Sequence, residues 1–106
     1  MIRYKSIQVT IPPASEKTEA ILHTTEGKKV NIKAFGRNEV DKVNSLLYID
    51  GDLVIDIPST LKMTNSNFIP VNMLLEGNHE VRVGGRNKDY YPAAIDLCIA
   101  YEEMKE

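Results

Sequence analysis

The chain has 106 residues, of which 42% are hydrophobic and 26% are charged, and its formal net charge at neutral pH is −2. This length allows one hydrophobic core, so residues 1–106 are expected to form a single domain. The small negative charge argues against a general binder of nucleic acid or of anionic membranes. The single cysteine, Cys98, excludes an internal disulfide, and the sequence contains no apolar run of membrane-spanning length. The first residues lack the apolar stretch of a signal peptide, so a cytoplasmic place of assembly is expected.

Short alternating runs of apolar and polar residues recur between turn signals, which is typical of an all-β sandwich or barrel. The first strand is predicted over 5–11. Pro12 and Pro13 end it, because neither has an N–H for further ladder pairing.

Three hairpins are predicted across turns that contain glycine: 18–25 with 29–36, 46–57 around its central turn, and 68–75 with 79–83. In the second, Asp50-Gly51 suits a type I′ turn, which needs positive φ angles at both positions. Pro70 places its strand at a sheet edge or interrupts it. The polar segment 58–67 is the longest predicted loop.

Two segments fit more than one structure. Residues 39–48 have apolar residues at helical spacing after a possible cap at Asn38, so a short helical turn is an alternative to a strand there. Residues 93–104 fit a helix with Pro92 at its first position, but their β-branched and aromatic residues alternate, which favours a strand. With that strand, about eight strands are predicted.

About eight strands in this length predict an antiparallel two-sheet sandwich with a jelly-roll-like topology. An immunoglobulin-type sandwich is the rival, although the Cys–Trp–Cys set of that family is absent.

Catalytic and metal-binding patterns are weak. Asp50, Asp52 and Asp56 superficially resemble an acidic calcium loop, but a hydrophobic strand follows where further ligands are needed, so a solvated hairpin tip is expected. His23 and His79 have no catalytic partner nearby in sequence and are interpreted as surface residues. Cys98 is interpreted as a small apolar side chain rather than a nucleophile. No cofactor, no metal and no enzymatic activity are predicted.

The segment Gly84-Gly85-Arg86-Asn87 fits either an anion-binding backbone nest or a bulge or loop that needs positive φ, with the second preferred. Tyr90 and Tyr91 follow it, and tyrosines are frequent anchors of interfaces and sugar sites. Adjacent residues of a strand point to opposite faces, so at most one of the two is expected to be an anchor. Arg86, Tyr90 and Tyr91 are the candidate contact residues for an interface or a ligand.

Strand and turn features follow one another over most of the chain in this order: Ile11-Pro12-Pro13, Glu-Gly-Lys-Lys-Val-Asn-Ile at 26–32, Tyr-Ile-Asp-Gly-Asp at 48–52, Ile-Pro-Val-Asn at 69–72, Leu-Glu-Gly-Asn at 75–78 and Glu-Val-Arg-Val at 80–83. In this order the chain resembles the small β-sandwich head-decoration and head-fibre proteins of tailed bacteriophages and other viruses. The resemblance implies a structural protein that oligomerises, often as a trimer, and docks on capsid or tail proteins through its termini or one end of the sandwich. No binding residue is transferred from that family, because no motif matches position by position.

The first hypothesis is therefore a non-enzymatic structural protein of a virus particle, assembled in the host cytoplasm and attached to the capsid or tail in a decoration or cement role. A homo-oligomer is expected, because association covers exposed sheet edges. The alternative is a carbohydrate- or small-ligand-binding module that uses Tyr90 or Tyr91 with the loop 58–67. A cupin-like metal enzyme ranks last, because two widely separated histidines are thin support for its metal site.

Overall fold

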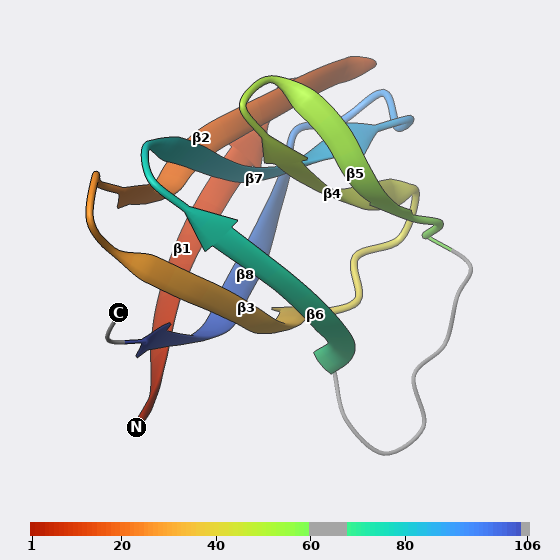
Figure 1. Cartoon of the computed structure of the whole chain (residues 1–106). Coiled ribbons are helices and arrows are strands. Elements are labelled where there is room, and N and C mark those ends of the chain that lie inside the picture. The colour runs from red at the N-terminus through yellow and green to blue at the C-terminus, as the bar shows by residue number, and fades with distance from the viewer. Residues whose placement is uncertain (60–67, 105–106) are drawn as a thin grey trace.

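The computed structural model describes residues 1–59 and 68–104, which form eight strands in two four-stranded antiparallel sheets packed as a sandwich (Figure 1). The first sheet has the order β1-β8-β3-β6 and the second the order β2-β7-β4-β5. The strands are β1 (Ile2–Ile11), β2 (Ser15–Thr24), β3 (Lys29–Arg37), β4 (Val43–Ile49), β5 (Asp52–Ile57), β6 (Phe68–Glu76), β7 (His79–Asn87) and β8 (Ala93–Met104).

The strand order is that of a jelly roll. Most consecutive strands lie in opposite sheets, and each sheet is completed by strands distant in sequence, such as β8 beside β1 and β7 beside β2. The predicted all-β fold, its eight strands and its two sheets are confirmed. The jelly-roll-like order fits better than the immunoglobulin-type rival, whose sheets divide the strands differently.

Both ambiguous segments are extended. β8 spans the whole of 93–104, with its alternating apolar side chains buried against the opposite sheet. The helical alternative at 39–48 is wrong, because β4 begins at Val43 and pairs with both β5 and β7. The part of the chain that the structure describes contains no helix long and apolar enough to span a membrane.

The hairpin at Asp50-Gly51 is confirmed, with φ angles of 52° and 84° at the two residues. The other two predicted hairpins are wrong. β2 pairs with β7, β3 pairs with β6 and β8, and the turns at Gly27 and Gly77 carry the chain from one sheet to the other. Both glycines do have the positive φ expected of a turn, but a turn signal does not specify whether the next strand joins the same sheet.

Gly84 and Gly85 lie inside β7, and neither has a positive φ angle, so both interpretations of this segment, as a nest and as a bulge, are wrong. The two glycines allow other parts of the chain to lie close against the backbone of β7. A Cβ built on Gly84 would lie 1.9 Å from the backbone oxygen of Lys17 in β2, and one on Gly85 would lie 2.5 Å from Cδ1 of Ile11. A side chain at Gly84 would therefore force β2 and β7 apart, and one at Gly85 would displace the Ile11 side chain of the opposite sheet.

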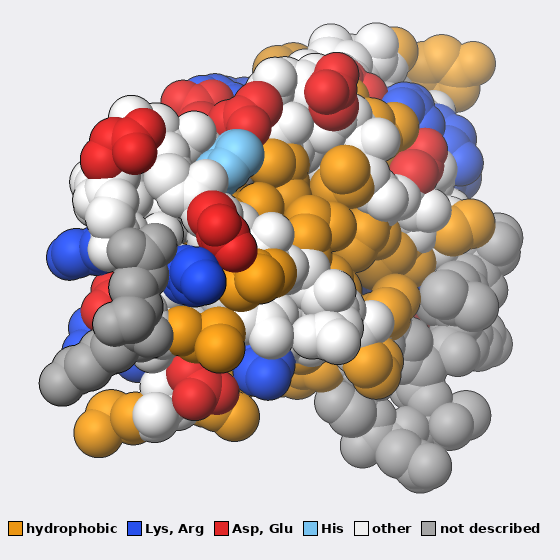
Figure 2. Space-filling model, viewed as in Figure 1, with side chains coloured by type: hydrophobic (Ala, Val, Ile, Leu, Met, Phe, Trp, Pro, Cys, Tyr) orange, Lys and Arg blue, Asp and Glu red, His pale blue; other side chains and the backbone are white. Residues whose placement is uncertain are grey.

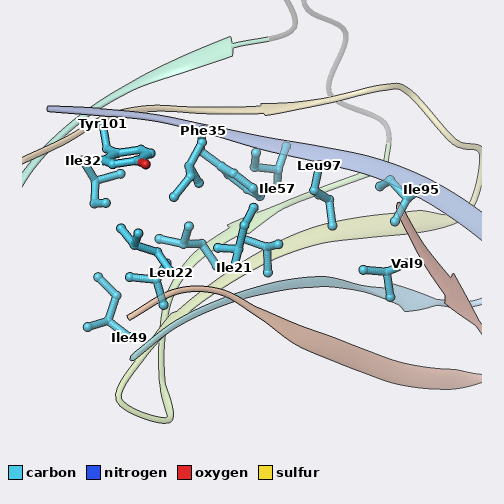
Figure 3. Close-up of a cluster of buried hydrophobic side chains, with 14 of the residues drawn as sticks. Val9, Ile21, Leu22, Ile32, Phe35, Ile49, Ile57, Ile95, Leu97 and Tyr101 are labelled. Atoms are coloured by element: carbon cyan, nitrogen blue, oxygen red, sulfur yellow. The ribbon is translucent and has the colours of Figure 1, made fainter. Parts of the chain in front are cut away.

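The core lies between the sheets, where inward-facing apolar side chains from both layers meet (Figure 3). On one side of the sandwich β1 contacts β2, while β5 and β6 are the edge strands of the other side. Pro70 lies on β6, which confirms its predicted edge position. Figure 2 shows hydrophobic side chains gathered on the face that contains β5 and β6; the exposed or partly buried apolar residues of these strands include Leu53, Val54, Ile55, Val71 and Met73.

Candidate interface at the tyrosine loop

The connection between β7 and β8, residues 88–92, displays two aromatic side chains at one end of the sandwich. Tyr90 is 88% exposed and Tyr91 is 73% exposed. The premise for expecting at most one anchor, that the two lie on a strand and point to opposite faces, is wrong, because both precede β8 and lie outside any strand. We call residues 88–92 the tyrosine loop.

Asn87, the last residue of β7, fixes the backbone of this loop through side-chain hydrogen bonds. Its side chain is almost completely buried, at 1% exposure. Its amide nitrogen Nδ2 donates to the carbonyl oxygens of Tyr91 at 2.8 Å and of Ile11 and Pro12 at 3.3 Å each. Its Oδ1 accepts the backbone N–H of Asp89 at 2.9 Å. One buried amide thus satisfies backbone groups of two separate chain segments.

Asp89 continues this network to the neighbouring turns. Its Oδ1 accepts the N–H of Tyr90 at 2.7 Å, and its carbonyl oxygen accepts the N–H of Ala14 at 3.0 Å. The N–H of Lys88 donates to the carbonyl oxygen of Lys42 at 2.9 Å. The tyrosine loop is therefore tied to both the β1–β2 turn and the β3–β4 connection, which lie beside it in Figure 1.

Because these hydrogen bonds already fix the loop backbone, the loop loses little further conformational entropy when its tyrosines bind a partner. A tyrosine side chain has only two main torsions, offers a large apolar ring, and ends in a hydroxyl that both donates and accepts hydrogen bonds. The pair is suited to anchoring a protein surface or to stacking on a sugar.

Arg86 does not join the tyrosines as a free cation. Its guanidinium donates to Asp56 Oδ2 at 3.0 Å and to Glu16 Oε1 at 3.1 Å. These carboxylates, Asp56 first, raise the pKa of Arg86 above its ordinary value. The side chain bridges β7 to β5 and β2 across the outer face of the second sheet, so its charge is already matched by this chain's own residues.

Sequence reasoning missed the rest of this outer-face network. The hydroxyl of Tyr48 donates to Glu16 Oε2 at 2.8 Å, which raises the pKa of Tyr48, and the amide of Asn44 donates to Asp56 Oδ1 at 2.9 Å. Leu46 lies between them on β4 and is completely buried, although it is not part of the core between the sheets. Alternation along β4 signals that Asn44, Leu46 and Tyr48 share a face, but not that Arg86 of β7 reaches Asp56 of β5.

The other candidate residues lie apart from the tyrosine loop. Asp50 is bonded to His79 and Asp56 to Arg86, so the aspartates of the predicted hairpin tip do not converge on one point. Burial raises the pKa of the Cys98 thiol, which lies on the first sheet. Within residues 1–59 and 68–104, no group of three or more His, Cys, Asp or Glu side chains is placed to hold a metal ion. Most of the polar loop 58–67, a component of the alternative ligand site, falls outside the described residues.

No protein-family model matches this chain, and no curated protein matches it. Among solved structures, the chain is similar to the nucleoplasmin-like N-terminal domain of Drosophila FKBP39, with a TM-score of 0.47 and 8% sequence identity. The match covers 97% of this chain and 92% of that one.

Proposed function

We propose that this chain is a non-enzymatic structural protein of a virus particle, which self-assembles and attaches to a capsid or tail protein. The observation that carries the proposal is a jelly roll with a rigid loop at one end that exposes two tyrosines. Jelly rolls are a common architecture of viral capsid proteins. Exposed aromatic side chains on a preorganised loop are the usual anchors of a protein interface. The resemblance to head-decoration and head-fibre proteins supports the same role.

Self-assembly is supported by the sheet edges. β1 and β6 flank the first sheet and β2 and β5 flank the second, so the described strands leave four edges, with backbone groups that no strand of the same sheet satisfies. The partly exposed apolar residues of β5 and β6 add surface that association would remove from water. A closed homo-oligomer, with a trimer favoured, covers such edges without forming an open fibre. Assembly in the host cytoplasm and residence in the virion belong to this proposal.

A carbohydrate-binding module is the second candidate, and the exposure of both tyrosine rings favours it. Jelly rolls also occur among lectins, and an exposed tyrosine ring can stack on the apolar face of a sugar. In that case Tyr90 or Tyr91 contacts the ligand directly, and the protein need not form a trimer.

Light scattering coupled to size exclusion separates the two candidates. At micromolar concentration, the structural role predicts a discrete species with three times the 11.9 kDa mass of one chain. A monodisperse monomer contradicts the self-assembly part of the proposal. A glycan array probed with the same preparation then tests the alternative, since binding that is lost in the Tyr90→Ala/Tyr91→Ala variant supports a sugar site.

A further inference from the structure

At the end of the sandwich opposite the tyrosine loop, His79, the first residue of β7, contacts two other segments of the chain. Its Nδ1 lies 2.5 Å from Oδ2 of Asp50 in the β4–β5 turn, and its Nε2 lies 2.9 Å from the carbonyl oxygen of Glu76 at the end of β6. An ionised carboxylate and a carbonyl are both acceptors, whereas a neutral imidazole has only one N–H. Only the imidazolium cation donates to both partners at once.

Asp50 is held from its other side by the backbone of Glu80. Its Oδ1 accepts the N–H of Glu80 at 2.8 Å, and its own N–H donates to the carbonyl oxygen of Glu80 at 2.9 Å. The carboxylate is therefore fixed where His79 meets it. The β4–β5 turn, the end of β6 and the start of β7 meet at this one side chain.

The other charged groups at this end are engaged with other partners. Glu80 has Arg82 3.5 Å away and His23 4.0 Å away, and the carboxylate of Glu76 faces Lys29 at 3.7 Å. Asp50 is thus the carboxylate that meets His79 directly. The titratable and charged residues at the ends of the elements that meet here are His23, Glu26, Lys28, Lys29, Asp50, Asp52, Glu76, Glu80 and Arg82.

We propose that His79 is a proton-dependent clamp: the protonated imidazole fixes the β4–β5 turn to the β6–β7 turn through two hydrogen bonds, and loss of the proton loosens the clamp by removing one of them. The clamp does not depend on the proposed role in a virus particle, because it rests only on the contacts within one chain.

The pH range of the clamp follows from its two partners. Asp50 raises the pKa of His79 above the ordinary value of 6.5, so the contribution of His79 to stability is full below 6.5 and is lost as the pH rises through the folded-state pKa. The Glu80 amide and His79 lower the pKa of Asp50 below 3.8, so its contribution is present above 3.8 and is lost as the pH falls through the lowered pKa. The clamp is complete between these two ordinary values.

The direct test is an NMR titration of both imidazoles in the full chain. His23 is the internal reference, because its side chain is 66% exposed and its nearest carboxylate oxygen is 4.0 Å away. The expected result is a His79 midpoint above that of His23, with both His79 nitrogens protonated near pH 6. On the alkaline side of that midpoint, the protection factors of the Asp50 and Glu80 amides should fall. A His79 midpoint at or below that of His23 overturns the proposal.

Two variants and one control extend the test to stability. His79→Gln and Asp50→Asn should each abolish the loss of unfolding free energy that the wild type shows as the pH rises above 6.5. Asparagine suits a positive φ, so Asp50→Asn removes the charge while keeping the turn, and it remains informative if His79→Gln does not fold. His23→Gln is the matched control and should keep the wild-type pH dependence. An unchanged alkaline loss in Asp50→Asn, or its disappearance in His23→Gln, contradicts the clamp.

Discussion

The two ends of this sandwich are fastened by different chemistry. At the end where β7 stops, a buried neutral amide, Asn87, bonds to backbone groups and holds the tyrosine loop. At the end where β7 starts, an ionisable pair, His79 and Asp50, joins two turns at the surface. A strand of nine residues thus separates a fastening built on a neutral amide from one built on a group that responds to protons. The exposed tyrosines lie at the end that the neutral amide holds.

Replacing the neutral fastening should have the largest effect on stability. In Asn87→Ala, the backbone N–H of Asp89 and up to three carbonyl oxygens lose their partner in a buried site. We expect the unfolding free energy to fall by about 2–4 kcal/mol, because each unsatisfied buried polar group costs about 1–3 kcal/mol and some of them will find water. Chemical denaturation at pH 6 and pH 9 should give the same loss.

Asn78→Ala is the control from the opposite end. Its amide donates to Glu26 Oε1 at 3.1 Å in an exposed position, so its loss should cost less than about 1 kcal/mol. If the two variants are equally stable, or if the effect of Asn87→Ala varies with pH, the contrast between the ends is wrong.

Removing the charge of Arg86 should lower the unfolding free energy by less than Asn87→Ala does. Unlike that of Asn87→Ala, this loss should depend on the salt concentration. Arg86→Met leaves Glu16 and Asp56 without their shared cation on a partly exposed surface, which should cost about 1 kcal/mol at low salt. Repeating the denaturation at 1 M salt should shrink the difference from wild type, because exposed charges are screened. Arg86→Lys keeps the charge without the two-pronged geometry and should lie between the two. A loss that salt does not alter would show that Arg86 acts by the packing of its side chain rather than by its charge.

The sequence was sufficient for those features that depend on neighbouring residues. Alternation identified β1 and β8 and the faces they bury, and Asp50-Gly51 identified the type I′ turn, since φ preferences are local. The sequence was not sufficient to predict which strands pair with one another. The turns at Gly27 and Gly77 reverse the chain, but the next strand joins whichever sheet buries its apolar face, and that choice depends on residues far away in sequence.

In the candidate site, too, the features that depend on neighbouring residues could be predicted and those that depend on distant residues could not. Tyr90 and Tyr91 were identified from their residue type and neighbours, whereas the partners of Arg86 were not, because Glu16 lies 70 positions away. The close approach of Gly84 to the Lys17 backbone was equally invisible, since it depends on how β2 is placed in the finished sheet. An asparagine at the end of a strand, two residues before an aspartate, was the available sign of the tight turn that Asn87 forms.

Acid should loosen the bonds of Asp50 while the bonds of the neutral Asn87 amide in the tyrosine loop remain. As the pH falls below 3.8 and through the lowered pKa of Asp50, the carboxylate gains a proton and its bonds to His79 and to the Glu80 N–H weaken. Amide exchange should then show a fall in the protection of Glu80, while the protection of Asp89, whose N–H is bonded to the neutral Asn87 amide, remains. Simultaneous loss of both protections would show that the ends do not open independently.

The smallest expected change in stability is at the tyrosines themselves. Both side chains are exposed, so Tyr90→Ala/Tyr91→Ala should alter the unfolding free energy by no more than about 0.5 kcal/mol. The same variant should lose attachment to a capsid or tail protein, or to a sugar, because hot-spot residues at an interface contribute most of its binding energy. Tyr48→Phe is the matched control: its hydroxyl bonds to Glu16 within the chain, so it should lose a little stability and no attachment. A tyrosine-loop variant that binds as the wild type does would leave the loop as a well-fastened turn with no role in attachment.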